Sequence, residues 1–145
     1  MNFSAYQCGI LQAKAYRLLR SSFAVALEPY EITVAEWSLL VLLQKENGMR
    51  HSQIAIILQV EAPLVTALVK QLERKRYIRR AEDPYDSRAK RLYLTKRGTD
   101  ILPQLEVAAC ATMQSILGNI SDDDLRGYFV VLEAITLQHA SGNSE

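Results

Sequence analysis

The sequence has few of the residues that build covalent or metal-based sites. Its 145 residues include only two cysteines, Cys8 and Cys110, and two histidines, His51 and His139. The cysteines are far apart in sequence and lie in helical patterns, so a disulfide framework is not expected. No group of histidines, cysteines and acidic residues has the spacing of metal ligands. We therefore expect neither a metal nor a cofactor.

Long hydrophobic runs are also absent. No apolar stretch approaches the ~20 residues that a membrane-spanning helix needs. The first residues have no basic start followed by an apolar core, which argues against a secretory signal. These absences predict a cytoplasmic protein without a membrane span. The apolar share of 49% is sufficient for the core of one domain.

Arrangements typical of catalysis are missing as well. The sequence shows no paired nucleophile and base, no glycine-rich phosphate loop and no cluster of metal ligands. Each of these is a feature by which an active site is recognised in sequence. An enzyme is therefore not expected.

Positive charge, in contrast, is concentrated in one segment. The chain carries a net charge of +1, but residues 70–97 hold eleven of its seventeen lysines and arginines and only four of its sixteen acids. This basic segment is therefore +7 (11 − 4), and the rest of the chain is −6 (6 − 12). Such a segment in a neutral protein is typical of a surface that binds nucleic acid. A solvated helix and hairpin is the alternative that charge alone leaves open.

Hydrophobic periodicity predicts a mainly α-helical (α+β) protein with one β-hairpin. Apolar residues at three-to-four spacing indicate a first helix over 4–27, which ends at the break Glu28-Pro29-Tyr30. Thr33 and Glu36 form a capping box for the second helix, and Ser52 is expected to cap the third. The remaining elements are expected over 62–76 (helix), 77–82 and 91–95 (strands), 95–117 (helix) and 121–139 (helix).

The helix over 62–76 has two contrasting faces. At ~100° per residue, four apolar side chains fall within one arc, namely Val65, Leu68, Val69 and Leu72. The opposite side carries a hydroxyl, a methyl, an amide and two long cations, on Thr66, Ala67, Gln71, Lys70 and Arg74. One face can therefore pack on a core while the other meets a partner.

The order of these elements predicts a winged helix-turn-helix. A short helix, a sharp break, a second helix and a basic hairpin follow one another along the chain. The second helix would enter the major groove of DNA, whose width matches a helix with its side chains. The hairpin tip over 83–91 would reach the adjacent minor groove, where negative potential is concentrated.

Two motifs resemble the MarR (multiple antibiotic resistance regulator) family of bacterial transcription factors. Asp86-Ser87-Arg88-Ala89-Lys90, followed by Leu94-Thr95 and then Gly98, is similar to the family's wing signature. Val65-Thr66-x-Leu68-Val69-x-x-Leu72-Glu73 is similar to its recognition helix. The resemblance covers about residues 5–140. It implies a homodimer that binds a pseudo-palindromic operator in double-stranded DNA, as an effector-responsive repressor.

The resemblance also implies roles for single residues. Arg88 would enter the minor groove with Asp86 holding it in position, although a plain turn residue and a solvated tip are the alternatives. Many relatives carry an arginine where this chain has Ala67, so a thymine-methyl contact is expected there instead of a guanine contact. The expected DNA-binding residues are Ser52, Gln53, Ala62, Pro63, Leu64, Thr66, Ala67, Lys70, Arg74, Asp86, Arg88 and Lys90.

Phosphates are the expected partners of several of these side chains. Lys70 and Arg74 lie further along the exposed face of the helix, and phosphate contacts outnumber base contacts in protein–DNA complexes. Ser52 and Gln53 begin the preceding helix, where backbone amides and short polar side chains bind phosphate. Simple helix capping is an equally good account of those two residues.

The terminal helices predict a dimer. A fifth helix of ~23 residues at ~1.5 Å each would be ~34 Å long, too long for a compact winged core to cover. A two-fold dimer buries its apolar side and places two recognition helices about one DNA turn, ~34 Å, apart. A monomer whose terminal helices fold back is the alternative. The expected organisation is a dimerisation helix over 1–30, the winged helix-turn-helix over 31–98, dimerisation helices over 99–140 and a disordered tail over 141–145.

Signal sensing is a further implication of the resemblance. Relatives often bind small aromatic anions where the dimer helices meet the winged domain, and the candidate residues here are Tyr6, Tyr16, Arg17, Tyr30 and Trp37. Packing in the core is the alternative for the aromatic ones. Peroxide-sensing relatives carry a reactive cysteine early in the first helix, which makes Cys8 a redox candidate, although no Lys, Arg or His within one helical turn would activate it. A winged-helix module that binds proteins and not DNA is the remaining alternative.

Overall fold

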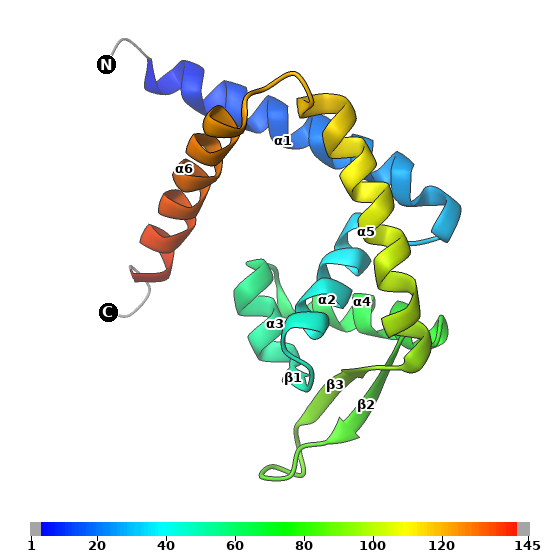
Figure 1. Cartoon of the computed structure of the whole chain (residues 1–145). Coiled ribbons are helices and arrows are strands. Elements are labelled where there is room, and N and C mark those ends of the chain that lie inside the picture. The colour runs from blue at the N-terminus through cyan, green and yellow to red at the C-terminus, as the bar shows by residue number, and fades with distance from the viewer. Residues whose placement is uncertain (1–3, 142–145) are drawn as a thin grey trace. The chain divides into compact units, whose positions relative to one another are not determined.

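The computed structural model describes residues 4–141 and contains six α-helices, one short 3₁₀ helix and three strands in that range (Figure 1). The chain divides into two compact units, one ending at Thr112 and one starting at Met113. The expected tail over 141–145 lies outside the described residues except for Ser141, which ends the last helix. The predicted mainly α fold with a winged helix-turn-helix is confirmed.

The elements follow the expected order along the chain. Their bounds are α1 Ala5–Leu27, η1 Glu28–Tyr30, α2 Val34–Lys45, β1 Met49–Arg50, α3 His51–Leu58, α4 Ala62–Arg74, β2 Ile78–Glu82, β3 Lys90–Leu94, α5 Lys96–Leu117 and α6 Asp122–Ser141. Two short elements are new relative to the sequence-based expectation, namely the 3₁₀ helix η1 at the predicted break and the strand β1. The strand has two residues, which is too short for an alternating pattern to reveal.

The three strands form one antiparallel sheet in the order β1-β3-β2. In the β2–β3 hairpin the register runs from the pair Ile78 and Leu94 to the pair Glu82 and Lys90. The hairpin projects away from the helices around it (Figure 1). Residues 83–89 form its tip, so the sheet carries the wing out from the helix-turn-helix.

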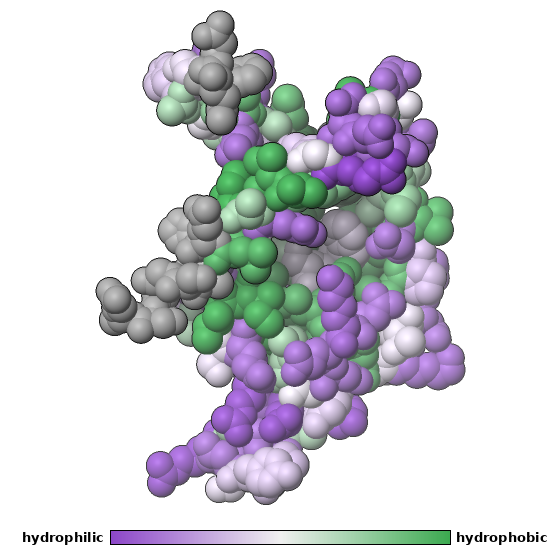
Figure 2. Space-filling view, turned by 60° about the vertical axis from the view of Figure 1, so that its left-hand side comes forward, coloured by the Kyte–Doolittle hydropathy of each residue, from purple (hydrophilic) through white to green (hydrophobic). Residues whose placement is uncertain are grey.

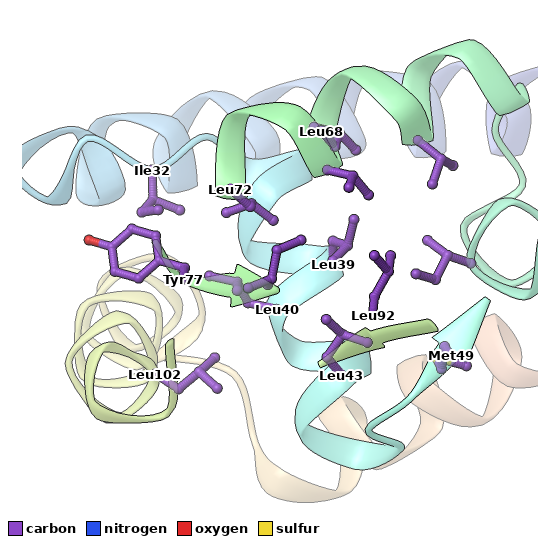
Figure 3. Close-up of a cluster of buried hydrophobic side chains, with 14 of the residues drawn as sticks. Ile32, Leu39, Leu40, Leu43, Met49, Leu68, Leu72, Tyr77, Leu92 and Leu102 are labelled. Carbon is purple, nitrogen blue, oxygen red and sulfur yellow. The ribbon is translucent and has the colours of Figure 1, made fainter. Parts of the chain in front are cut away.

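The core of the first unit lies between α2, α4 and the sheet. Figure 3 shows Leu68 and Leu72 pointing from α4 toward Leu39 of α2 and Leu92 of β3. These side chains are at most 8% exposed, and Val65 and Val69 are buried with them. The predicted apolar face of the fourth helix is therefore confirmed. Its burial fixes which side of α4 remains in solvent.

The helix starts explain where the elements begin. The capping box of α2 is confirmed, because Glu36 N–H donates to Thr33 Oγ1 at 3.1 Å and Thr33 N–H donates to Glu36 Oε2 at 2.8 Å. The expectation that Ser52 caps α3 is wrong. The cap residue is Arg50, whose N–H donates to Gln53 Oε1 at 2.8 Å. Arg50 is held in an extended conformation by its pairing in β1, so the helix begins two residues earlier than predicted.

The Leu-Thr-x-x-Gly motif forms the junction between β3 and α5. Thr95 Oγ1 accepts from Gly98 N–H at 3.1 Å and donates to the Arg76 carbonyl at 2.7 Å. A Cβ on Gly98 would lie 2.1 Å from the carbonyl oxygen of Tyr77. Glycine is therefore required where the first turn of α5 lies against the Tyr77 carbonyl, just before β2.

In the second unit, α6 begins as expected, since Asp124 N–H donates to Ser121 Oγ at 3.2 Å. Among the residues described, no single helix has both the length and the apolar character to span a membrane, although α3 and α4 meet both limits when taken together across their bend.

Candidate nucleic-acid interface

The helix-turn-helix is formed by α3 and α4, which are bent by 113° relative to each other. Gln59 ends α3 in a left-handed conformation with φ of 52°. Pro63 lies in the first turn of α4, where its missing N–H costs nothing. An angle of this size is typical of helix-turn-helix pairs. Because of this bend, the axis of α4 runs in a different direction from that of α3.

The outer face of α4 is free of contacts with the core. Every α4 residue expected at the interface is exposed, namely Ala62, Pro63, Leu64, Thr66, Ala67, Lys70 and Arg74. The Lys70 side chain has no hydrogen bond or ion pair among residues 4–141. Arg74 Nη2 donates to Gln71 Oε1 at 2.6 Å, one turn away on the same face. This face therefore offers a methyl group, a hydroxyl and two cations to a partner.

The wing tip is built around Asp86. Its Oδ1 accepts from Arg88 N–H at 3.0 Å, and its carbonyl accepts from Ala89 N–H at 3.0 Å. Asp86 thus fixes the backbone of Arg88, and neither a hydrogen bond nor an ion pair joins its carboxylate to the Arg88 guanidinium. Arg88 is exposed, and its guanidinium has no acidic partner in the described part of the chain. The lower end of Figure 2, where the hairpin projects, is mostly hydrophilic.

Asp83, at the base of the loop that forms the wing tip, is a residue that the sequence did not single out. Its side chain is fully buried, and its Oδ2 accepts from Nε of Arg50 and Nε of Arg91, both at 2.7 Å. Its Oδ1 accepts from Tyr85 N–H at 2.8 Å. The hydrogen bond from Arg50, followed by that from Tyr85, holds the pKa of this carboxyl well below its usual range. Its position just before Pro84 was the only signal in sequence, and it does not reveal burial.

Several cations of the basic segment are already paired. Lys75, Arg80, Lys90, Arg91 and Lys96 form ion pairs with Glu36, Glu73, Glu82, Asp83 and Asp100. Two others stack on aromatic rings, with Arg79 at 4.7 Å from the Tyr93 centroid and Arg97 at 5.0 Å from the Tyr77 centroid. The charge of +7 therefore overstates what is available to a polyanion. The cations that stand without an acidic partner within residues 4–141 include Lys70, Arg74 and Arg88.

One buried ion pair anchors the C-terminal end of α4. Lys75 Nζ donates to both oxygens of the Glu36 carboxylate, at 2.8 and 2.9 Å, and to the Glu31 carbonyl at 2.6 Å. Glu36 is only 2% exposed. The same carboxylate also caps α2 through Thr33. The start of α2 and the end of α4 are thus held by one group.

The comparisons agree with this geometry. The model of the MarR family matches residues 32–90, which span most of the winged helix-turn-helix. A MarR transcriptional regulator from Methanosarcina mazei Go1 has a similar fold, with a TM-score of 0.86 and 20% identity over 94% of this chain and 98% of that one. Residues 32–90 thus match the MarR family, and the fold is that of a MarR regulator. Members of this family are transcriptional regulators that bind DNA and small-molecule effectors.

Two further proteins are also similar to this chain. The HTH-type transcriptional regulator YwoH of Bacillus subtilis (strain 168) is 29% identical over 112 residues, covering 77% of this chain and 81% of that protein. BpsR of Bordetella bronchiseptica, whose DNA binding is regulated by 6-hydroxynicotinic acid, has a TM-score of 0.81 and 18% identity over 90% of this chain and 98% of that one.

The five effector candidates do not form one cluster within the chain. Tyr6, Tyr16 and Arg17 are exposed on α1, while Trp37 on α2 packs against Phe23 with ring centroids 5.6 Å apart. Tyr6 precedes Phe23 by 17 residues, which is ~26 Å along a helix. Tyr30 is half-buried against the core.

Two further features bear on sensing. Cys8 is exposed on α1, and its thiol makes no hydrogen bond within residues 4–141. Cys110 Sγ lies 3.4 Å from Glu106 Oε1, and this hydrogen bond to a carboxylate raises the pKa of the thiol. The side chain of His139 lies outside the described residues. In the part that is described, no three His, Cys, Asp or Glu side chains gather as metal ligands would.

Proposed function

We propose that the protein is a dimeric, sequence-specific DNA-binding transcriptional regulator that acts as an effector-responsive repressor. The recognition helix over 62–76 occupies the major groove, and the wing over 83–91 occupies the adjacent minor groove. The observation that carries this proposal is the Arg88 side chain, which is exposed, has no acidic partner in the described range 4–141, and lies on a tip whose backbone is fixed by Asp86. Arginine is favoured in a narrow minor groove because of its negative potential.

The exposed face of α4 supports major-groove binding. Thr66 and Ala67 offer methyl groups to thymine, while Lys70 and Arg74 are long enough to reach phosphates. Ser52 and Gln53 are exposed in the first turn of α3. Gln53 already accepts from Arg50 N–H, so its amide NH₂ is the part that remains for a phosphate. Lys90 pairs with Glu82 in solvent at 3.2 Å and can exchange this partner for a phosphate.

Exposed apolar side chains on the terminal helices support a homodimer. Ile10, Leu11, Leu18 and Val25 of α1 are between 46% and 67% exposed. In α6, Phe129, Val130, Val131, Ile135 and Leu137 are between 44% and 67% exposed. Apolar patches of this extent mark an interface, and a second copy with two-fold symmetry covers both sets. The residues over 1–30 and 99–140 are therefore proposed as the dimerisation helices.

Trp37 supports an effector site between α1 and α2. Its Nε1 is buried without a hydrogen-bond acceptor among the described residues. A buried indole N–H usually has a partner. The carboxylate of a small aromatic acid would supply one, with Tyr30 nearby in sequence and Tyr6, Tyr16 and Arg17 contributed by α1 of either subunit. Binding there would change the spacing of the two recognition helices and lower operator affinity.

Titration of selected DNA tests the proposal. A duplex is selected from a random pool by the wild-type protein, and its affinity is then measured by fluorescence anisotropy across a range of salt concentrations. Arg88→Ala should weaken binding by about 1–3 kcal/mol. Lys70→Ala should weaken selected and random duplexes alike and reduce the salt slope by about one unit. If the wild type enriches no sequence and shifts no duplex, the protein is not a DNA-binding regulator.

A further inference from the structure

Three segments that flank the proposed DNA interface meet at the carboxylate of Asp83. Arg50 is the N-cap residue of α3, Arg91 belongs to β3, and Tyr85 lies in the wing loop. All three donate hydrogen bonds to this one group, at 2.7, 2.7 and 2.8 Å. We propose that Asp83 is the positioning residue of the wing, which fixes the direction of the hairpin tip relative to α3 so that Arg88 and α4 meet the same duplex. This inference rests on the proposed function.

The first step of the argument is the pairing of two like charges. Arg50 and Arg91 are directly opposite each other in the β1–β3 ladder. Like charges at opposed positions of a sheet destabilise it. Asp83 Oδ2 accepts from the Nε of both arginines and so neutralises the repulsion. The short strand β1, and with it the start of α3, therefore depends on this carboxylate to remain paired with the wing.

The second step concerns the loop itself. Asp83 N–H donates to the Ala89 carbonyl at 3.2 Å, which closes the base of the loop. Asp83 Oδ1 holds Tyr85 N–H, and Asp86 Oδ1 holds Arg88 N–H. Two aspartates thus fix successive parts of the loop, with the buried one at its base. The Tyr85 ring, which is 89% exposed, offers no packing that would fix the loop in another way.

The neighbouring acid provides a matched control. Glu82 is adjacent to Asp83 in the hairpin, and its carboxylate pairs with Lys90 at 3.2 Å. Both side chains of that pair are well exposed, at 76% and 42%. An exposed pair of this kind contributes little to structure. Glu82→Gln and Asp83→Asn change the net charge by the same amount, so only the position of the carboxylate differs between them.

The proposal predicts opposite effects on specific and non-specific DNA. Asp83→Asn frees Arg50 and Arg91 and adds one positive charge per subunit, so binding to a random duplex should be unchanged or tighter. The same change leaves the wing tip without its anchor, so affinity for the selected duplex should fall about fivefold to twentyfold. Global unfolding of the variant would instead weaken its binding to both the selected and the random duplex. Glu82→Gln should leave the preference for the selected duplex within about twofold of the wild type.

The experiment combines these variants with Arg88→Ala. Affinities of the full-length wild type, Asp83→Asn, Glu82→Gln, Arg88→Ala and the double variant Asp83→Asn/Arg88→Ala are measured on the selected duplex and on a random duplex of equal length. If Asp83 acts by placing Arg88, the double variant should be weaker than Arg88→Ala by no more than about twofold. If the fold-losses in affinity of Asp83→Asn and Arg88→Ala multiply in the double variant, the inference is overturned. It is also overturned if Asp83→Asn binds the selected duplex like the wild type.

Two safeguards keep the result interpretable. Arg50→Gln removes one of the two arginine partners of Asp83 without burying a new group, and it should reduce the preference for the selected duplex even if Asp83→Asn does not fold. Hydrogen exchange of the Tyr85 amide, measured without DNA, should accelerate in Asp83→Asn or Arg50→Gln and stay unchanged in Glu82→Gln. Unchanged exchange in both variants would overturn the inference.

If the wild type binds no duplex, the proposed function fails and the inference falls with it. If Arg88→Ala weakens binding but these variants do not, only the inference falls.

Discussion

At the scale of single residues, two positions show how local chemistry fixes the wing and its attachment. Gly98 has no Cβ, so the start of α5 can lie close to the Tyr77 carbonyl. Asp83 accepts hydrogen bonds from two arginines. Gly98 was recognisable in sequence as part of a motif, although its physical reason was not. Asp83 was not recognisable, because its partners Arg50 and Arg91 come from segments 33 residues and 8 residues away.

Replacement of Gly98 by alanine should destabilise the protein. The new Cβ would lie 2.1 Å from a backbone oxygen, so the start of α5 must move. A loss of about 1–3 kcal/mol in the free energy of unfolding is expected from urea titration. Gly9→Ala is the control, since a Cβ there meets nothing within 4 Å and alanine favours the helix by roughly 0.5–1 kcal/mol. Equal stability of Gly98→Ala and the wild type would contradict this account.

The acid dependence of stability should report on Asp83. Its folded-state pKa is lowered, first by the hydrogen bond from Arg50, while the unfolded value is near ~3.9. The carboxylate therefore stabilises the folded state at pH values above ~4, and this contribution is lost as the pH falls further. Thermal unfolding should show a constant gap between the wild type and Asp83→Asn from pH 8 to pH 5, and a smaller gap below ~4. A gap that persists unchanged into acid would show that the charge is not responsible.

At the scale of elements, α4 was the most predictable part of the protein. Its apolar arc of Val65, Leu68, Val69 and Leu72 is buried, as the helical period required. The strand β1 and the true cap of α3 were not predictable, because a pairing of two residues leaves no periodic signal. The exposed face of α4 followed from sequence, but the groups that hold its C-terminal end did not. Those groups, Glu36 and Lys75, are 39 residues apart.

Loss of the Glu36–Lys75 pair should loosen the recognition helix. Lys75→Ala leaves the buried Glu36 carboxylate without its cation and removes the donor to the Glu31 carbonyl. We expect a loss of about 1–3 kcal/mol in the free energy of unfolding. Lys45→Ala, at an exposed lysine in the last turn of α2, should stay within about 0.5 kcal/mol of the wild type. Chemical denaturation of the two variants measures both losses. Similar losses in Lys75→Ala and Lys45→Ala would contradict a stabilising role for the Glu36–Lys75 pair.

At the scale of the whole molecule, the proposed function depends on two copies of the chain. Sequence indicated the need for a partner through the length of α5 and the apolar residues of the terminal helices. The exposure of those residues in α1 and α6 is consistent with that need. A single winged domain could contact only one half-site, whereas a two-fold dimer can contact two half-sites one DNA turn apart.

Sedimentation should therefore find a dimer. The mass of one chain is 16.4 kDa, so a species of about 33 kDa is expected. Leu18→Arg on α1, where the leucine is 60% exposed, should shift the protein toward the monomer. Ile56→Arg on α3, where the isoleucine is 75% exposed, is the control and should leave the dimer intact. A monomeric wild type, or equal effects of the two substitutions, would contradict the assignment of α1 to the interface.

Hydroxyl-radical footprinting of the selected duplex tests the central claim most directly, because it reports minor-groove contacts at single-nucleotide resolution. The account predicts two protected minor-groove regions, related by two-fold symmetry and flanking two contacted major grooves about one turn apart. Arg88→Ala should remove the outer minor-groove protection and leave the major-groove contacts, seen by guanine methylation, in place. A footprint confined to one groove, or outer protection that survives in Arg88→Ala, would contradict the assignment of α4 and the wing to DNA.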